Sequence, residues 1–102
     1  MQNKKQFLSE YIFADILTKE KLLAESEKEM EKLKLNLRFD ELIFNTKDIE
    51  GDVKVEIGYS ISSWKNLIAM EENVNSTLRD ELKVLRYRKQ VISSLDEYDL
   101  NS

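Results

Sequence analysis

Hydrophobic residues recur at helical spacing through the first third of the chain. Spacings of three and four place such residues on one side of an α-helix. Asn3 can cap this helix, with Gln6 three residues later completing a capping-box pair. The pattern predicts an amphipathic helix over residues 3–35, with a broad apolar face over residues 7–17 that packs fully and a narrow stripe over 18–34 that packs on one neighbour. The apolar positions are Phe7, Leu8, Tyr11, Ile12, Ile16, Leu17, Leu22, Leu23, Met30 and Leu33.

Thr18 leaves the continuity of this helix open. As an N-cap, Thr18 would place Leu17 and Leu22 at the spacing of a hydrophobic staple, so a second helix could begin there. No Gly or Pro lies nearby. One continuous helix, bent if necessary, is therefore favoured over two.

A heptad repeat fits the same segment only in part. Ile16, Leu23 and Met30 recur every seven residues. The companion positions include Lys19 and Ser26, whose polar side chains do not suit a regular coiled-coil seam. An amphipathic helix that packs on its own chain is therefore favoured over a two-stranded coiled coil.

Apolar and polar residues alternate over Val53–Ile61, VKVEIGYSI, which predicts a half-buried β-strand. Residues 45–52, NTKDIEGD, supply the turn residues of a loop before it. Residues 36–45 are apolar in an imperfect alternation that slips around Glu41. This segment is either a first strand with a bulge or an extension of the preceding helix. The strand interpretation yields a central β-hairpin.

A last helix is expected from Ser62 or Ser63, either of which can act as an N-cap. We therefore expect a single domain, residues 1–102, with a mainly α (α+β) fold. In it two long amphipathic helices flank a central β-hairpin and form an antiparallel helical pair, which can assemble into a bundle. The helical stripe comprises Trp64, Leu67, Ile68, Val74, Leu78, Leu82, Leu85, Ile92 and Leu95.

Composition excludes much chemistry. The chain has no Cys and no His, so Ser–His triads, Cys–His dyads and Cys-ligated zinc cannot be built from it. Two glycines are too few for a dinucleotide-binding or phosphate-cradling loop. The acidic loop around Gly51 fails as a calcium site, because the glycine is misplaced and Tyr59 stands where a bidentate Glu is needed. We expect no enzymatic activity, no cofactor and no metal.

The net charge of −4 and the pI near 4.9 disfavour a nucleic-acid binder and suit a basic protein partner. Glutamates in the first helix and aromatic residues at the ends of the predicted strand are candidates to bind such a partner. The simpler interpretation of the glutamates is a solvated helix face on which they pair with lysines. The simpler interpretation of the aromatic residues is that they pack under the hairpin. The candidate protein-binding residues are Glu25, Glu27, Glu29, Glu31, Tyr59 and Trp64.

One basic concentration interrupts the acidic chain, over residues 79–89. It could contact phosphates, although Asp80 and Glu81 dilute it, and the polar side of an amphipathic helix explains it more simply. The candidate nucleic-acid-binding residues are Arg79, Lys83, Arg86, Arg88 and Lys89.

We do not expect the basic start of the chain to be a secretion signal, because Glu10 and Asp15 interrupt the apolar region behind it. No apolar run approaches the roughly 18 residues that a membrane-spanning helix needs. We expect a cytoplasmic protein, in the host cell if the gene is viral, that does not interact with membranes.

The order helix–hairpin–helix is similar to that of a prefoldin subunit, in which the hairpin assembles an oligomer. The composition resembles that of small accessory proteins of bacteriophages and mobile elements. The first hypothesis is a non-enzymatic protein-binding module, an inhibitor or regulator of the anti-defence type that acts by occupying a surface of a protein partner. The alternatives are a self-assembling structural or chaperone-like subunit, which would be a homo-oligomer, and a nucleic-acid binder.

Overall fold

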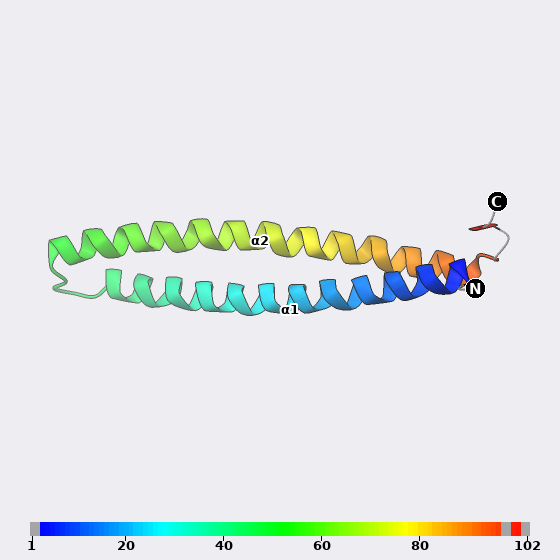
Figure 1. The fold of residues 1–102 in the computed structure, drawn as a ribbon. Coiled ribbons are helices and arrows are strands. Elements are labelled where there is room, and N and C mark those ends of the chain that lie inside the picture. Colours follow the sequence, from blue (N-terminus) through cyan, green and yellow to red (C-terminus); the bar gives the residue numbers. More distant parts are fainter. Residues whose placement is uncertain (1–2, 97–98, 101–102) are drawn as a thin grey trace. The chain divides into compact units, whose positions relative to one another are not determined.

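In a computed structural model the chain forms two helices, and the structure describes residues 3–96 and 99–100. α1 spans Lys4–Phe44 and α2 spans Gly51–Ser94, with residues 45–50 connecting them (Figure 1). No strand occurs in these described ranges. The predicted α+β fold with a central β-hairpin is therefore wrong, and the likeness to a prefoldin subunit, which depended on the hairpin, is lost. Residues 1–2, 97–98 and 101–102 of the predicted domain lie outside the described residues.

Residues 53–61 belong to α2, not to a strand, and α2 does not begin at Ser62 or Ser63. The prediction failed because a short alternating pattern can also contain a helical one. Ile57 and Ile61 are four residues apart and Trp64 follows three later, so one helix face collects all three, and each is half-buried. The β-branched residues cost the helix only a few tenths of a kcal/mol each. A lone hairpin would have been marginal in water.

Residues 36–44 are also helical, so α1 extends through the segment that the sequence left open. Side chains that follow the helix donate hydrogen bonds to two of its last carbonyl oxygens. Asn45 Nδ2 donates to Glu41 O at 2.9 Å, and Thr46 Oγ1 donates to Leu42 O at 2.9 Å. Asp48 then takes a left-handed backbone conformation, with φ of 64°, which turns the chain.

α1 begins at the cap that the sequence predicts. The Gln6 backbone N–H donates to Asn3 Oδ1 at 3.0 Å, while the Gln6 side chain donates to Glu10 Oε1 and does not close the capping box. Thr18 does not start a new helix. Its Oγ1 donates to Ala14 O at 3.1 Å inside α1, and the continuous helix favoured from the sequence is the one observed.

The chain divides into two compact units, each built from part of α1 and part of α2. The terminal unit contains the described residues up to Ala24 and from Ser76 onward, and the loop unit is Glu25–Asn75. In the terminal unit the helices run antiparallel, because Lys5 Nζ donates to Leu95 O while Lys19 pairs with Glu81. The loop unit is an antiparallel pair closed by residues 45–50.

The terminal unit has a small apolar core along one seam between its helices. Ile12 and Ile16 of α1 lie on this seam, and Lys19 and Leu23 continue it at spacings of three and four. Lys19 does not break the repeat, because its amine reaches out to pair with Glu81. The buried core residues are Ile12, Ile16, Leu82, Leu85 and Ile92.

The loop unit has a seam of the same spacing, with more polar residues in it. On α1 the seam passes through Ser26, Met30, Leu33 and Leu37, of which Ser26 and Leu33 are buried. Buried Asn75 lies on the α2 side. Lys19 and Ser26, which counted against a regular seam, therefore both lie on it, since a small or pairing polar side chain is accommodated at each position. The favoured interpretation, a helix that packs on its own chain, agrees with the structure.

Candidate protein-binding groove

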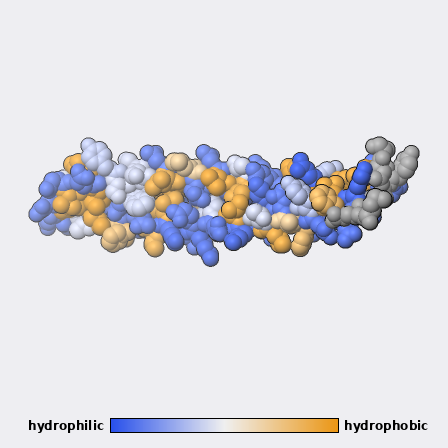
Figure 2. Space-filling model, in the orientation of Figure 1, coloured by the Kyte–Doolittle hydropathy of each residue, from blue (hydrophilic) through white to orange (hydrophobic). Residues whose placement is uncertain are grey.

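The terminal unit leaves large apolar side chains uncovered. Each helix segment has one helical neighbour, so only the seam positions of the broad apolar face over residues 7–17 are buried. The predicted fully packed end is not observed. Tyr11 is 64% exposed, and Phe7, Phe13 and Leu17 are also more than half exposed. Apolar residues accordingly reach the surface over both helices on the face drawn in Figure 2.

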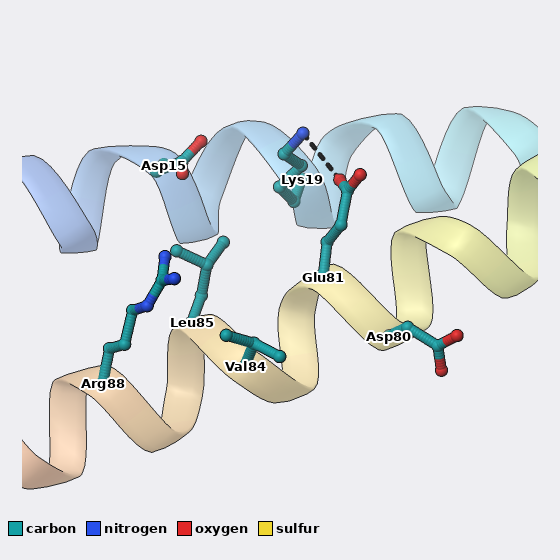
Figure 3. A pocket seen from close by; sticks show the side chains of 7 residues that line it. All are labelled: Asp15, Lys19, Asp80, Glu81, Val84, Leu85 and Arg88. Carbon is teal, nitrogen blue, oxygen red and sulfur yellow. Dashed lines mark ion pairs between the residues drawn. The ribbon is translucent and has the colours of Figure 1, made fainter.

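Tyr11 lies with other apolar side chains along one side of the seam of the terminal unit. A hollow of about 520 Å³ lies there, and a second hollow of about 380 Å³ adjoins it, because both share Asp15, Leu85 and Arg88 (Figure 3). We call the two together the side groove. Its lining residues are Leu8, Tyr11, Ile12, Asp15 and Lys19 of α1, and Asp80, Glu81, Val84, Leu85, Tyr87, Arg88, Val91 and Ile92 of α2, with Leu95 beyond it.

The other side of the same seam is polar. A hollow of about 370 Å³ there is lined by lysine, arginine, serine and glutamine side chains. At about 100° of rotation per residue, Ser9 and Arg86 fall on the opposite side of their helices from Tyr11 and Arg88. The two hollows of the terminal unit thus differ: apolar and tyrosine side chains predominate around the first, and polar side chains predominate around this one. The lining residues of the polar side are Lys5, Ser9, Arg86, Lys89, Gln90, Ile92 and Ser93.

Charges of opposite sign cross the middle of the side groove. Lys19 Nζ lies 2.7 Å from Glu81 Oε2, and this hydrogen bond raises the pKa of Lys19 above its ordinary value despite some desolvation. Asp15, one turn before Lys19 on α1, and Arg88, two turns after Glu81 on α2, line the same hollow, and Arg88 extends toward α1 (Figure 3). No ion pair joins Asp15 to Arg88 in the described part of the chain. Each level of the groove therefore carries an acid on one helix and a base on the other.

The four glutamates predicted to bind a protein all lie exposed on the α1 segment of the loop unit. They do not share one face. Glu25 and Glu29 lie on one side of the seam formed by Ser26 and Met30, while Glu27 and Glu31 lie on the other, because residues two apart differ by about 200°.

The two aromatic candidates are separated as well. Tyr59 is exposed on α2, whereas Trp64 is half-buried and its Nε1–H donates to Asp40 Oδ2 at 2.8 Å. Ser60 Oγ donates to the same oxygen at 2.6 Å. Trp64 therefore contributes to packing within the loop unit, and Tyr59 remains available to a partner.

The basic residues predicted to bind nucleic acid are all exposed but divide between two sides of α2. Arg79, Lys83 and Arg86 share one side, with Arg86 reaching to 3.9 Å from Glu20, and Lys89 lies over the Phe13 ring at 5.6 Å. Arg88 lies on the other side, in the side groove. The five residues do not form one continuous basic surface.

Sequence reasoning missed the side groove as a site. Its α1 residues were visible as the broad face over residues 7–17, but that face was assigned to a packed core. Val84 and Val91 gave no signal of their own, because Val84 joins Asp15, and Val91 joins Tyr11, only when α2 docks on α1.

Comparison with known proteins adds no relative: no family model, curated protein or solved structure matches the chain. Among the described residues, no cluster of three or more acidic side chains is placed to hold a metal ion. No helix in the described ranges is long and apolar enough to span a membrane.

Proposed function

We propose that this chain is a non-enzymatic protein-binding module that acts by occupying a surface of its partner. The observation that carries the proposal is the side groove, where Tyr11, Val84, Tyr87 and Val91 stay exposed beside the seam. Contiguous apolar surface of this kind marks interaction sites, and tyrosine is enriched at their energetic centres. The hollow on the opposite side of the same unit is lined mainly by polar side chains.

The geometry suits a partner helix. A groove between two paired helices accepts the apolar stripe of a third, as in other helix-in-groove complexes. Asp15 and Arg88 in the middle of the groove would fix the register of that helix, since polar groups within an apolar interface set orientation more than affinity. The proposal places the protein in the cytoplasm, which the absence of cysteine supports.

Photocrosslinking from within the side groove tests the proposal. A photoreactive phenylalanine derivative replaces Tyr11 in the full chain, expressed in the cell that naturally makes it. We expect a covalent adduct heavier than the 12.1 kDa chain after irradiation. The matched control carries the same residue at Ser9, which lies on the polar side of the same helix. Equal adducts from both positions, or none from Tyr11, would refute the proposal.

A further inference from the structure

The side groove is complementary to itself. Lys19 and Glu81 lie at one level of the antiparallel pair, as their 2.7 Å contact shows. Moving toward the start of α1 means moving toward the end of α2, and in that direction Asp15 and Arg88 line the same hollow, which we take as the second level. At the first level the base is on α1 and the acid on α2, and at the second level the signs are reversed.

A two-fold axis parallel to the helices exploits this pattern. Such an axis brings two side grooves face to face, with α1 of each copy opposite α2 of the other at the same level. Asp15 then faces Arg88 of the second copy, and Lys19 faces its Glu81. The apolar residues match too, because Tyr11 comes opposite Val91. Every helix keeps antiparallel neighbours, as in an up-down four-helix arrangement.

We infer that the occupant of the side groove is the side groove of a second copy of this chain, related by a two-fold axis parallel to the helices. This inference rests on the proposed function and names its partner. An arbitrary helix would need its own acid and base at the right spacing. A second copy supplies both, because the acids and bases of the two levels already line one hollow between α1 and α2 within one chain.

Charge reversal in separate chains tests the inference. In the Asp15→Arg dimer, the introduced arginine would face Arg88 at both symmetry-related contacts. In the Arg88→Asp dimer, the introduced aspartate would face Asp15 at both. Each variant alone should dimerise at least about tenfold more weakly than the wild type, because like charges are opposed across a desolvated groove. An equal mixture of the two should recover wild-type affinity, because both contacts of the heterodimer again join opposite charges.

The measurement is the weight-average mass by sedimentation equilibrium, which for the wild type should rise toward twice 12.1 kDa with concentration. Glu10→Arg and Lys83→Asp are matched controls, since they make the same charge changes at exposed positions outside the side groove. Both controls should dimerise like the wild type. Circular dichroism establishes that each variant is folded, and the double variant Asp15→Arg/Arg88→Asp should dimerise by itself.

Several outcomes overturn the inference. If the wild type stays monomeric at millimolar concentration, a second copy does not occupy the side groove. If the single variants dimerise as well as the wild type, Asp15 and Arg88 do not face each other across the dimer. A mixture that stays monomeric points to an axis across the helices, with α1 opposite α1. A monomer that still forms an adduct of another mass from Tyr11 would leave the proposed function standing and remove only the self-association.

Discussion

The Asp40 carboxylate holds the two helices of the loop unit together through one oxygen. It accepts hydrogen bonds from Ser60 Oγ and from Trp64 Nε1, at 2.6 and 2.8 Å. Both donors are partly buried, so removal of the carboxylate leaves them without this partner. We expect Asp40→Ala to lower the free energy of unfolding by about 2 kcal/mol.

Urea unfolding followed by the fluorescence of the single tryptophan measures this loss. Glu31→Ala is the matched control, because it removes an exposed carboxylate from the same helix and should change stability by less than about 0.5 kcal/mol. If the two substitutions have the same effect, the Asp40 contacts do not stabilise the loop unit.

Ser26 is a buried polar residue in the seam of the loop unit. It is 5% exposed, and its Oγ has no hydrogen-bond partner among the described residues. A buried hydroxyl of this kind is costly, so we expect Ser26→Ala to raise the free energy of unfolding by about 1 kcal/mol. Ser63→Ala, at an exposed position of α2, controls for helix propensity and should gain less than about 0.5 kcal/mol. A destabilising Ser26→Ala would show that the hydroxyl is needed.

At the scale of elements, the decisive segment is residues 53–61, which forms helix where alternation predicted a strand. Gly58 tests this directly. A Cβ built there lies 3.6 Å from Phe44 Cε2, an ordinary contact, so alanine fits. Because glycine is a poor helix residue, Gly58→Ala should raise the free energy of unfolding by about 0.5–1 kcal/mol.

Circular dichroism during chemical unfolding reads out the gain. Gly51→Ala, at the first residue of α2, is the control. It should change the free energy of unfolding less than Gly58→Ala does, because the end of a helix is less ordered than its interior. A Gly58→Ala chain less stable than the wild type would contradict the helical conformation of residues 53–61.

The sequence predicted α1 well near its start and α2 well beyond Ser63. Asn3 was recognisable as a cap, and the helical stripe continued without Gly or Pro through Thr18. The strand prediction for residues 53–61 was wrong because nine residues are too few to distinguish a period of two from one of 3.6. Ile57 and Ile61 fit both periods. The sequence did not predict the seam, because Lys19 and Ser26 place polar side chains at two of its heptad positions.

The side groove was less predictable than the helices. Leu8 and Tyr11 were identified as apolar and helical, but burial depends on how many neighbours a helix has. The sequence predicted a hairpin that could cover the helices, and the described residues form none, so each helix segment has a single helical neighbour. Asp15 and Arg88 line one hollow because of the register between α1 and α2, and no local sequence pattern predicts that register.

At the scale of the whole molecule, both units pair two helices and bury little beyond the seam. Two-helix pairs have small cores, and association supplies the burial that they lack. In the terminal unit this need coincides with a groove that is apolar at Tyr11 and Val91 and self-complementary in charge. Association through this groove is therefore the central claim.

Isotope-filtered NMR on an equal mixture of ¹³C-labelled and unlabelled chains tests that claim most directly, because it detects only contacts between copies. We expect nuclear Overhauser effects from the Val91 methyl groups of the labelled chain to the Tyr11 ring of the unlabelled one. Absence of any contact between copies at millimolar concentration would contradict the account. So would contacts that link Tyr11 to α1 of the other copy, for example to Leu22.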